Sequence, residues 1–133
     1  MLIRNVAAAA VVGVLFAACA ETSVMQMSQD TFRVQTNAAP ACGPTGARNL
    51  AYRTAATEVI RKGGDLYIIG SDQSDTGMTG DIFNGFYQNY SQGIVVRMID
   101  PNSPDARNAL SAREMLGPEW QAVVAEGVPN TCM

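Results

Sequence analysis

Three aspartates, Asp72, Asp75 and Asp81, lie in one stretch of Ser, Thr and Gly and are the side chains most suited to chemistry. Two carboxylates can serve glycoside hydrolysis, and clustered carboxylates can bind calcium. The spacing does not follow the D-x-[DN]-x-[DN]-G pattern of a calcium loop. We therefore expect solvated loop acids and no metal site, with a carboxylate-based hydrolase or a glycan-binding module of the periplasm as the alternative.

Other catalytic side chains are scarce. The sequence contains no histidine, which excludes Ser-His and Cys-His catalysis and removes the usual general base near neutral pH. The single lysine, Lys62, falls at the expected exposed end of a helix, not in an apolar pocket that would lower its pKa. The chain is predicted to be non-enzymatic and to use no cofactor.

Four aromatic residues follow the aspartates at close spacing: Phe83, Phe86, Tyr87 and Tyr90. Their spacing fits a helix, whereas Asn84-Gly85 is typical of a hairpin turn. We expect an irregular or hairpin loop here. Because aromatic side chains are enriched in interface cores, the group is a candidate contact patch. The alternative is a satellite core beneath the loop.

The N-terminus has the composition of an export signal. Arg4 supplies a positive charge, residues 6–16 form an apolar core, and Ala17-Ala18 are small enough for a peptidase cleft. The apolar run stops before Glu21 and is shorter than the roughly 20 residues that a transmembrane helix needs. We predict a signal peptide over residues 1–18.

The residues Phe16-Ala17-Ala18-Cys19 resemble the lipobox of bacterial lipoproteins, in which a bulky apolar residue and two small ones precede a cysteine. The resemblance implies cleavage before Cys19 and attachment of several acyl chains, such as palmitate, which anchor a protein stably. Ala20 after the cysteine implies the outer membrane, facing the periplasm. The alternative is cleavage after Ala18-Cys19-Ala20, which would give a secreted or periplasmic soluble protein.

Two further cysteines follow the lipobox cysteine. With Cys19 assigned to lipid, Cys42 and Cys132 remain, and an oxidising compartment would pair them in a disulfide. The alternative is two free buried cysteines. The spacing contains no CxxC, which argues against a zinc or redox pair.

Charge and length restrict the partners. The formal net charge is −3, and no cluster of Lys and Arg is present to hold nucleic acid or anionic lipid electrostatically. Residues 19–133 are enough for one domain with one core. The expected partners are the membrane, through the N-terminal lipid, and a protein of the envelope.

Residue patterns predict the elements that must position these groups. Residues 19–30 are polar and small, which favours a flexible tether. Phe32 and Val34 alternate with polar residues, which predicts a strand over 31–36. An alanine-rich stripe predicts a helix that starts at Gly43-Pro44 or at Thr45 and runs to Lys62, where two glycines stop it.

The second half is predicted from similar signals. We expect a central strand over 65–70, a mobile loop over 71–80 and a third strand over 93–99. Ser111 and Glu114 form a capping-box pattern between short helices, and a C-terminal helix covers 119–126. The prediction for 31–133 is a single α+β domain, with at least three strands and with the alanine-rich and C-terminal helices on one face of the sheet.

The order of strand, Cys/Pro loop, alanine-rich helix and apolar strand resembles a group of small bacterial outer-membrane lipoproteins. The resemblance is carried by Phe32, Val34, Ala51, Arg53, Ala55, Ala56, Glu58, Gly64, Asp65, Tyr67 and Ile69. It implies a membrane-anchored envelope protein with a structural or partner-binding role.

Overall fold

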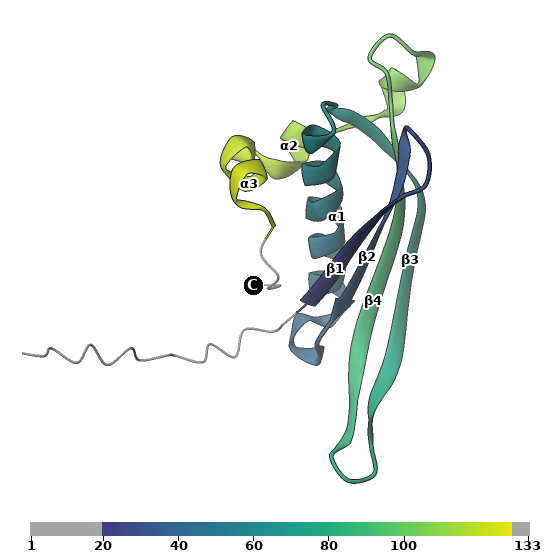
Figure 1. Ribbon diagram of the computed structural model, residues 1–133, viewed down its shortest axis with the longest axis vertical. Coiled ribbons are helices and arrows are strands. Elements are labelled where there is room, and N and C mark those ends of the chain that lie inside the picture. Colours follow the sequence, from purple (N-terminus) through teal and green to yellow (C-terminus); the bar gives the residue numbers. More distant parts are fainter. Residues whose placement is uncertain (1–19, 129–133) are drawn as a thin grey trace, which may run out of the picture.

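The computed structural model describes residues 20–128, which form one antiparallel five-stranded sheet and three α-helices. The strand order is β1-β2-β4-β3-β5. Figure 1 shows α1 lying along one face of the sheet, with α2 and α3 on the same side. The predicted α+β domain with helices on one face is confirmed.

The first two strands, β1 (Ala20–Gln26) and β2 (Thr31–Ala38), form a hairpin. In β2 the side chains of Phe32, Val34 and Thr36 are fully buried, as the alternating pattern predicts. The prediction of a flexible tether over residues 19–30 is wrong, because β1 occupies most of that range. An edge strand needs few apolar side chains, since its backbone hydrogen bonds to β2 hold it in place.

Helix α1 (Gly43–Arg61) follows a short 3-10 turn, η1 (Pro40–Cys42). Its buried residues are Ala47, Leu50, Ala51, Ala55, Ala56, Thr57 and Val59. These mostly small side chains let the helix lie close against the sheet. Gly63, at φ +88°, ends the helix as predicted, because this backbone conformation favours glycine.

Strands β3 (Leu66–Asp81) and β4 (Gly85–Met98) form a long hairpin. The prediction of a mobile loop over 71–80 is wrong, because β3 continues through it with each residue paired to β4. The predicted third strand is present but starts at Gly85, not at 93. The hairpin interpretation of Asn84-Gly85 is confirmed. Strand β3 has β5 (Leu110–Ser111) beside it at only one end.

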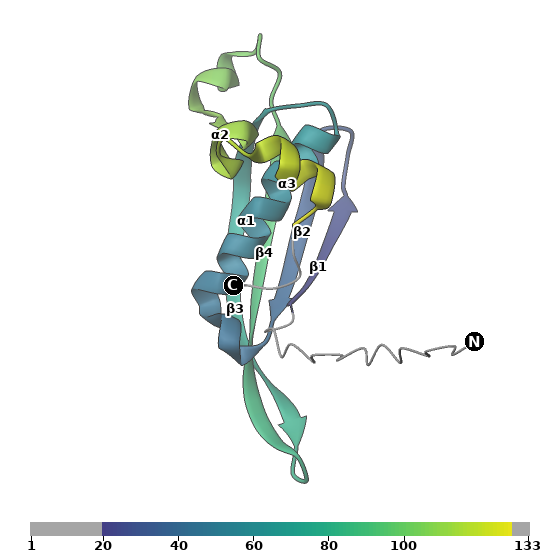
Figure 2. The same ribbon diagram turned by 90° about the vertical axis from the view of Figure 1, so that its left-hand side faces the viewer.

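At one end of the sheet, one residue from each of β1, β2, β4 and β3 lies in the same paired row. Ala20 pairs with Ala38, Ala38 with Tyr90, and Tyr90 with Thr76. Beyond this row only β3 and β4 continue, and we call residues 77–89 the arm. Figures 1 and 2 both show the arm projecting past α1 and past the ends of β1 and β2.

The core lies between α1 and the sheet and consists of two clusters. The larger cluster contains Phe32, Val34, Ala51, Ala55, Ala56, Val59, Tyr67, Ile94, Val96 and Ala112. The smaller one contains Ala20, Ala38, Ala47 and Leu50, with Cys42, Tyr90 and Val128 packed against it. The smaller cluster therefore sits at the base of the arm.

The C-terminal part packs beside α1. It comprises η2 (Pro104–Asn108), α2 (Ala112–Leu116) and α3 (Trp120–Glu126). The Ser111 hydroxyl accepts the Glu114 N–H at 3.4 Å, so the predicted capping interaction is present on the serine side. Arg61 of α1 donates to the Val124 carbonyl at 2.9 Å and holds α3 in place.

Candidate functional site

The three aspartates do not converge. Asp72 and Asp75 are three positions apart on β3 and so project from opposite faces of the sheet. Asp81 lies at the end of the arm, about 30 Å of extended chain beyond Asp72. Across residues 20–128 no group of three His, Cys, Asp or Glu is placed to hold a metal ion. The structure therefore does not bring Asp72, Asp75 and Asp81 together as a hydrolase would need.

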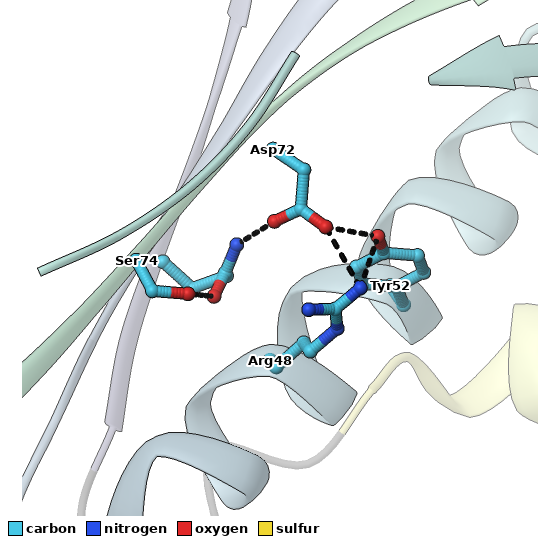
Figure 3. A network of polar contacts seen from close by, with 5 residues as sticks. Arg48, Tyr52, Asp72 and Ser74 are labelled. Carbon is cyan, nitrogen blue, oxygen red and sulfur yellow. Dashed lines mark hydrogen bonds and ion pairs between the residues drawn. The ribbon is translucent and has the colours of Figure 1, made fainter. Parts of the chain in front are cut away.

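Asp72 instead joins α1 to the β3–β4 hairpin, as Figure 3 shows. Its Oδ2 atom accepts the Tyr52 hydroxyl at 2.5 Å and forms an ion pair with Arg48 Nη2 at 2.8 Å. Its Oδ1 atom accepts the Gln92 side-chain amide. Gln92 in turn accepts the Ser74 hydroxyl at 2.5 Å.

The side chains of this network differ in burial. Gln92 is buried, whereas the side chains of Asp72 and Arg48 are 26% and 53% exposed. The Arg48 guanidinium lies 5.1 Å from the Tyr52 ring centroid. Burial, and then the hydrogen bond to Asp72, raise the pKa of Tyr52. The Ser74 hydroxyl is directed at an amide and not at a base, so the arrangement braces the helix and does not activate a nucleophile.

The turn at the end of the arm is held by Asp81. Its Oδ1 atom accepts the backbone N–H of Asn84 at 2.7 Å and of Phe83 at 2.9 Å. Its Oδ2 atom accepts the Asn84 side-chain amide at 3.2 Å. These bonds, led by the one from the Asn84 backbone, lower the pKa of Asp81. Gly85, at φ +82°, completes the reversal, which explains the Asn84-Gly85 signal.

Four apolar side chains of the arm face solvent. Their exposed fractions are 64% for Met78, 82% for Ile82, 89% for Phe83 and 60% for Phe86, and we call them the tip patch. By strand alternation, Met78 and Phe86 lie on the face that α1 covers farther along the sheet. The patch thus continues the core-facing surface beyond the end of the helix.

The predicted aromatic group is divided by the fold. Phe83 and Phe86 are exposed in the tip patch, whereas Tyr90 packs against the smaller core cluster. The side chain of Tyr87 lies outside the described part of the structure. The satellite-core alternative therefore applies to Tyr90 and not to Phe83 or Phe86. Sequence reasoning missed Met78 and Ile82, although their apolar side chains beside a hairpin turn were a signal.

The chain segment around the arm contains acidic but no basic side chains, and Arg48 of α1 pairs with Asp72 near the base of the arm. Residues 63–96 contain four aspartates and neither Lys nor Arg. A shallow cleft of about 560 Å³ lies at the opposite end of the sheet. Its charged groups have local partners. Arg97 pairs with Asp105 at 3.5 Å, the Asp30 carboxylate accepts the Ser28 and Thr31 hydroxyls, and Asp100 accepts the backbone N–H of Asn102 at 2.8 Å. That pairing favours a structural role for the cleft.

Comparison with known proteins leaves the family open, because the chain matches no family model, no curated protein and no solved structure. Within residues 20–128, no helix is both long and apolar enough to cross a membrane. Cys19 and Cys132 lie outside the described residues, so the predicted lipid site and the predicted disulfide with Cys42 stay predictions. The arm and its tip patch are the strongest candidate for a functional surface.

Proposed function

We propose that this chain is a non-enzymatic lipoprotein of the bacterial cell envelope. Cys19 carries the lipid that anchors it, at the outer membrane and facing the periplasm, and the arm binds another envelope component. The observation that supports the binding role is the tip patch, in which four apolar side chains are at least 60% exposed on a narrow ribbon.

The physical argument starts from the instability of such a ribbon. A two-stranded hairpin without a third strand or a covering helix is marginally stable in water. Here the network around Asp72 braces the hairpin near its base, and Asp81 braces its turn. The exposed apolar side chains are thus presented in one preorganised place, which lowers the entropic cost of binding. Clustered exposed apolar groups mark interaction sites more often than scattered ones do.

The alternative of a carboxylate-based hydrolase is not supported by the geometry. Asp72 has partners on both carboxylate oxygens, and both carboxylate oxygens of Asp81 accept hydrogen bonds from the turn. Neither faces a second carboxylate across a cleft, which both inverting and retaining glycosidases require.

The binding role is tested by photocrosslinking in living cells. A photoreactive phenylalanine analogue replaces Phe83 in one variant and Met25 in the other. Met25 is a suitable control because it is 67% exposed but lies on β1. We expect a discrete adduct, with protein or with lipid, from position 83 only. Equal labelling from both positions, or none from 83, would contradict a binding role for the arm.

The anchor is tested separately. Cys19→Ser should move the protein from the membrane fraction to the soluble fraction, because the lipid is its strongest membrane contact. Mass spectrometry of the wild-type N-terminus should show an acylated cysteine. A wild-type protein that is soluble and begins at Glu21 would show that the alternative cleavage is correct.

A further inference from the structure

The attachment point of the chain and the base of the arm lie at the same end of the sheet. Ala20 is the first residue of β1 and is 4% exposed within the smaller core cluster. It belongs to the row that also contains Ala38, Tyr90 and Thr76. Cys19 precedes Ala20 directly, and consecutive Cα atoms are about 3.8 Å apart. A lipid on Cys19 would therefore hold this end of the sheet at the membrane, with no tether between them.

The arm reaches farther in the same direction. From Thr76 to the turn at Ile82 is six positions along β3, or about 20 Å at the rise of a strand. A leaflet that holds acyl chains on Cys19 is thus within reach of the tip patch. An upright sheet would carry Ile82 about 20 Å past the anchor and into the hydrocarbon. The sheet must therefore lie strongly inclined to the membrane normal to keep Ile82 and Phe83 at the level of the headgroups.

We infer that the outer part of the tip patch, Ile82, Phe83 and Phe86, inserts into the interfacial region of the leaflet that holds the lipid on Cys19. This inference rests on the proposed function, because the anchor determines where the membrane lies. The protein would then touch the membrane at two points, the lipid and the arm. Two contacts fix the orientation of the sheet, which a single lipid on one residue does not.

Charge decides which surface the patch can enter. The charged residue of the arm is Asp81, and Asp75 lies two positions before the arm on β3. Anionic lipids and the arm of a second copy would therefore both repel the patch. A leaflet of zwitterionic phospholipid lacks this repulsion. The expected lipid is therefore phosphatidylethanolamine or phosphatidylcholine.

Backbone hydrogen bonding limits the depth of insertion. From Gly85 to Gln88, β4 pairs with β3 and not with β2, so the other edge of this stretch needs water or another hydrogen-bonding partner. Unpaired backbone groups are costly in hydrocarbon. Only the turn and Phe86 can enter the boundary between headgroups and acyl chains, where aromatic and aliphatic side chains of peripheral proteins lie. Asp81 can stay at headgroup level because its carboxylate bonds to the turn itself.

Because the lipid already holds the domain at the membrane, a weak affinity of the tip for lipid is enough to keep the tip inserted. Three apolar side chains bind a membrane weakly by themselves. Once the lipid holds the domain at the surface, insertion of the tip becomes an intramolecular step with an effective concentration in the millimolar range. The arm therefore need not bind vesicles tightly in isolation to be inserted in the anchored protein.

The test uses the acylated protein in vesicles of phosphatidylethanolamine and phosphatidylcholine that carry bromine on the acyl chains. Trp120 is the only tryptophan, so Trp120→Phe removes the native tryptophan fluorescence. Phe83→Trp, and Met25→Trp as the control, then each introduce a single indole whose fluorescence is measured. We expect brominated lipid to quench the indole at position 83 and to leave the one at position 25 unchanged. Circular dichroism melts check that each variant folds.

A second measurement avoids the change at Trp120. The chain from position 19 to 133 with Cys19→Ser is sedimented with an excess of the same vesicles, with and without Ile82→Ser and Phe83→Ser. The bound fraction should fall with the tip substitutions and stay constant with Met25→Ser and Met27→Ser.

The outcomes separate this inference from the anchor. An unquenched indole at position 83 in a protein whose Cys19 is acylated overturns the insertion and leaves the lipoprotein proposal intact; a protein adduct from position 83 would then identify the partner as a protein. If Cys19 carries no lipid, the anchor proposal fails. Sedimentation unaffected by the tip substitutions would then overturn the insertion as well.

Discussion

Arg48 on α1 and Asp72 on β3 form an ion pair, with 2.8 Å between Nη2 and Oδ2, close to the base of the arm. The pair ties the N-terminal half of the helix to the hairpin. Asp72 also holds the amide of Gln92, which is buried. One carboxylate therefore connects a solvent-exposed cation to a buried dipole.

This relationship predicts unequal effects of substitution at its two ends. Asp72→Ala should lower the free energy of unfolding by about 1–3 kcal/mol, because it leaves the buried Gln92 amide without its acceptor. Arg48→Ala should cost less than about 1 kcal/mol, since an exposed ion pair is screened by water. Urea denaturation measures both. Equal losses would show that the ion pair, and not the amide bond, stabilises the contact.

Tyr67 predicts a stability change at alkaline pH. Its side chain is fully buried, its hydroxyl has no hydrogen-bond partner, and burial raises its pKa to about 12. The folded state keeps the proton between pH 10 and 12 while the unfolded state releases it, so stability should fall by about 2–3 kcal/mol across that window.

Tyr67→Phe should abolish this alkaline loss and should be neutral or stabilising by about 1 kcal/mol at pH 7, because it removes an unsatisfied hydroxyl. Tyr52→Phe is the matched control, since the Tyr52 hydroxyl has partners and its loss should destabilise the domain. Urea titrations at pH 7 and pH 11 test both variants. A large destabilisation by Tyr67→Phe would show that the Tyr67 hydroxyl forms a hydrogen bond in the folded protein in solution.

Asp81 predicts local loosening of the turn at acidic pH. Because its pKa is lowered in the folded state, its stabilising contribution is present above pH 3.8 and is lost as the pH falls through the folded-state pKa. Asp81→Ala should therefore speed amide exchange at Phe83 and Asn84 at neutral pH while leaving the core amides unchanged. Asp75→Ala is the control. Unchanged exchange in Asp81→Ala would mean that Gly85 alone maintains the turn.

The cysteine pair predicts a global effect. Val128, the last described residue, packs with Cys42 against the same cluster, which brings the C-terminal end of the described chain close to Cys42. A bond from Cys42 to Cys132 would close a long loop, for which chain entropy gives about 4–5 kcal/mol. Cys42→Ser and Cys132→Ser should each lower the melting temperature, and the double variant should add little. Two reactive thiols in the native, unreduced protein would contradict the pairing.

Local sequence signals predicted the elements whose determinants lie within a few residues. The alanine stripe and Gly63 give α1 its face and its end, Phe32 and Val34 give β2 its buried side, and Asn84-Gly85 gives the turn. Each depends on side-chain periodicity or on a backbone conformation that one residue type favours. These parts of the fold needed no knowledge of distant residues.

Pairing partners decided the rest. Residues 71–80 look like a loop in the sequence because Gly and Asp have low strand propensity and no apolar alternation is present. Strand β4 nevertheless supplies a hydrogen-bonding partner along their length. The same holds for β1, which is polar but pairs with β2. Whether a segment forms a strand depends on the strand that pairs with it, and the composition of the segment does not show which strand that is.

The candidate site shows the same division. By itself the sequence determined which side chains are available: carboxylates and aromatics, with no histidine and one lysine. Only the tertiary structure decided that Asp72 braces a helix, that Phe83 faces solvent and that Tyr90 is packed inside. The physical reason is register, because a residue's place along the β3–β4 hairpin determines whether α1 covers it or the arm carries it into solvent.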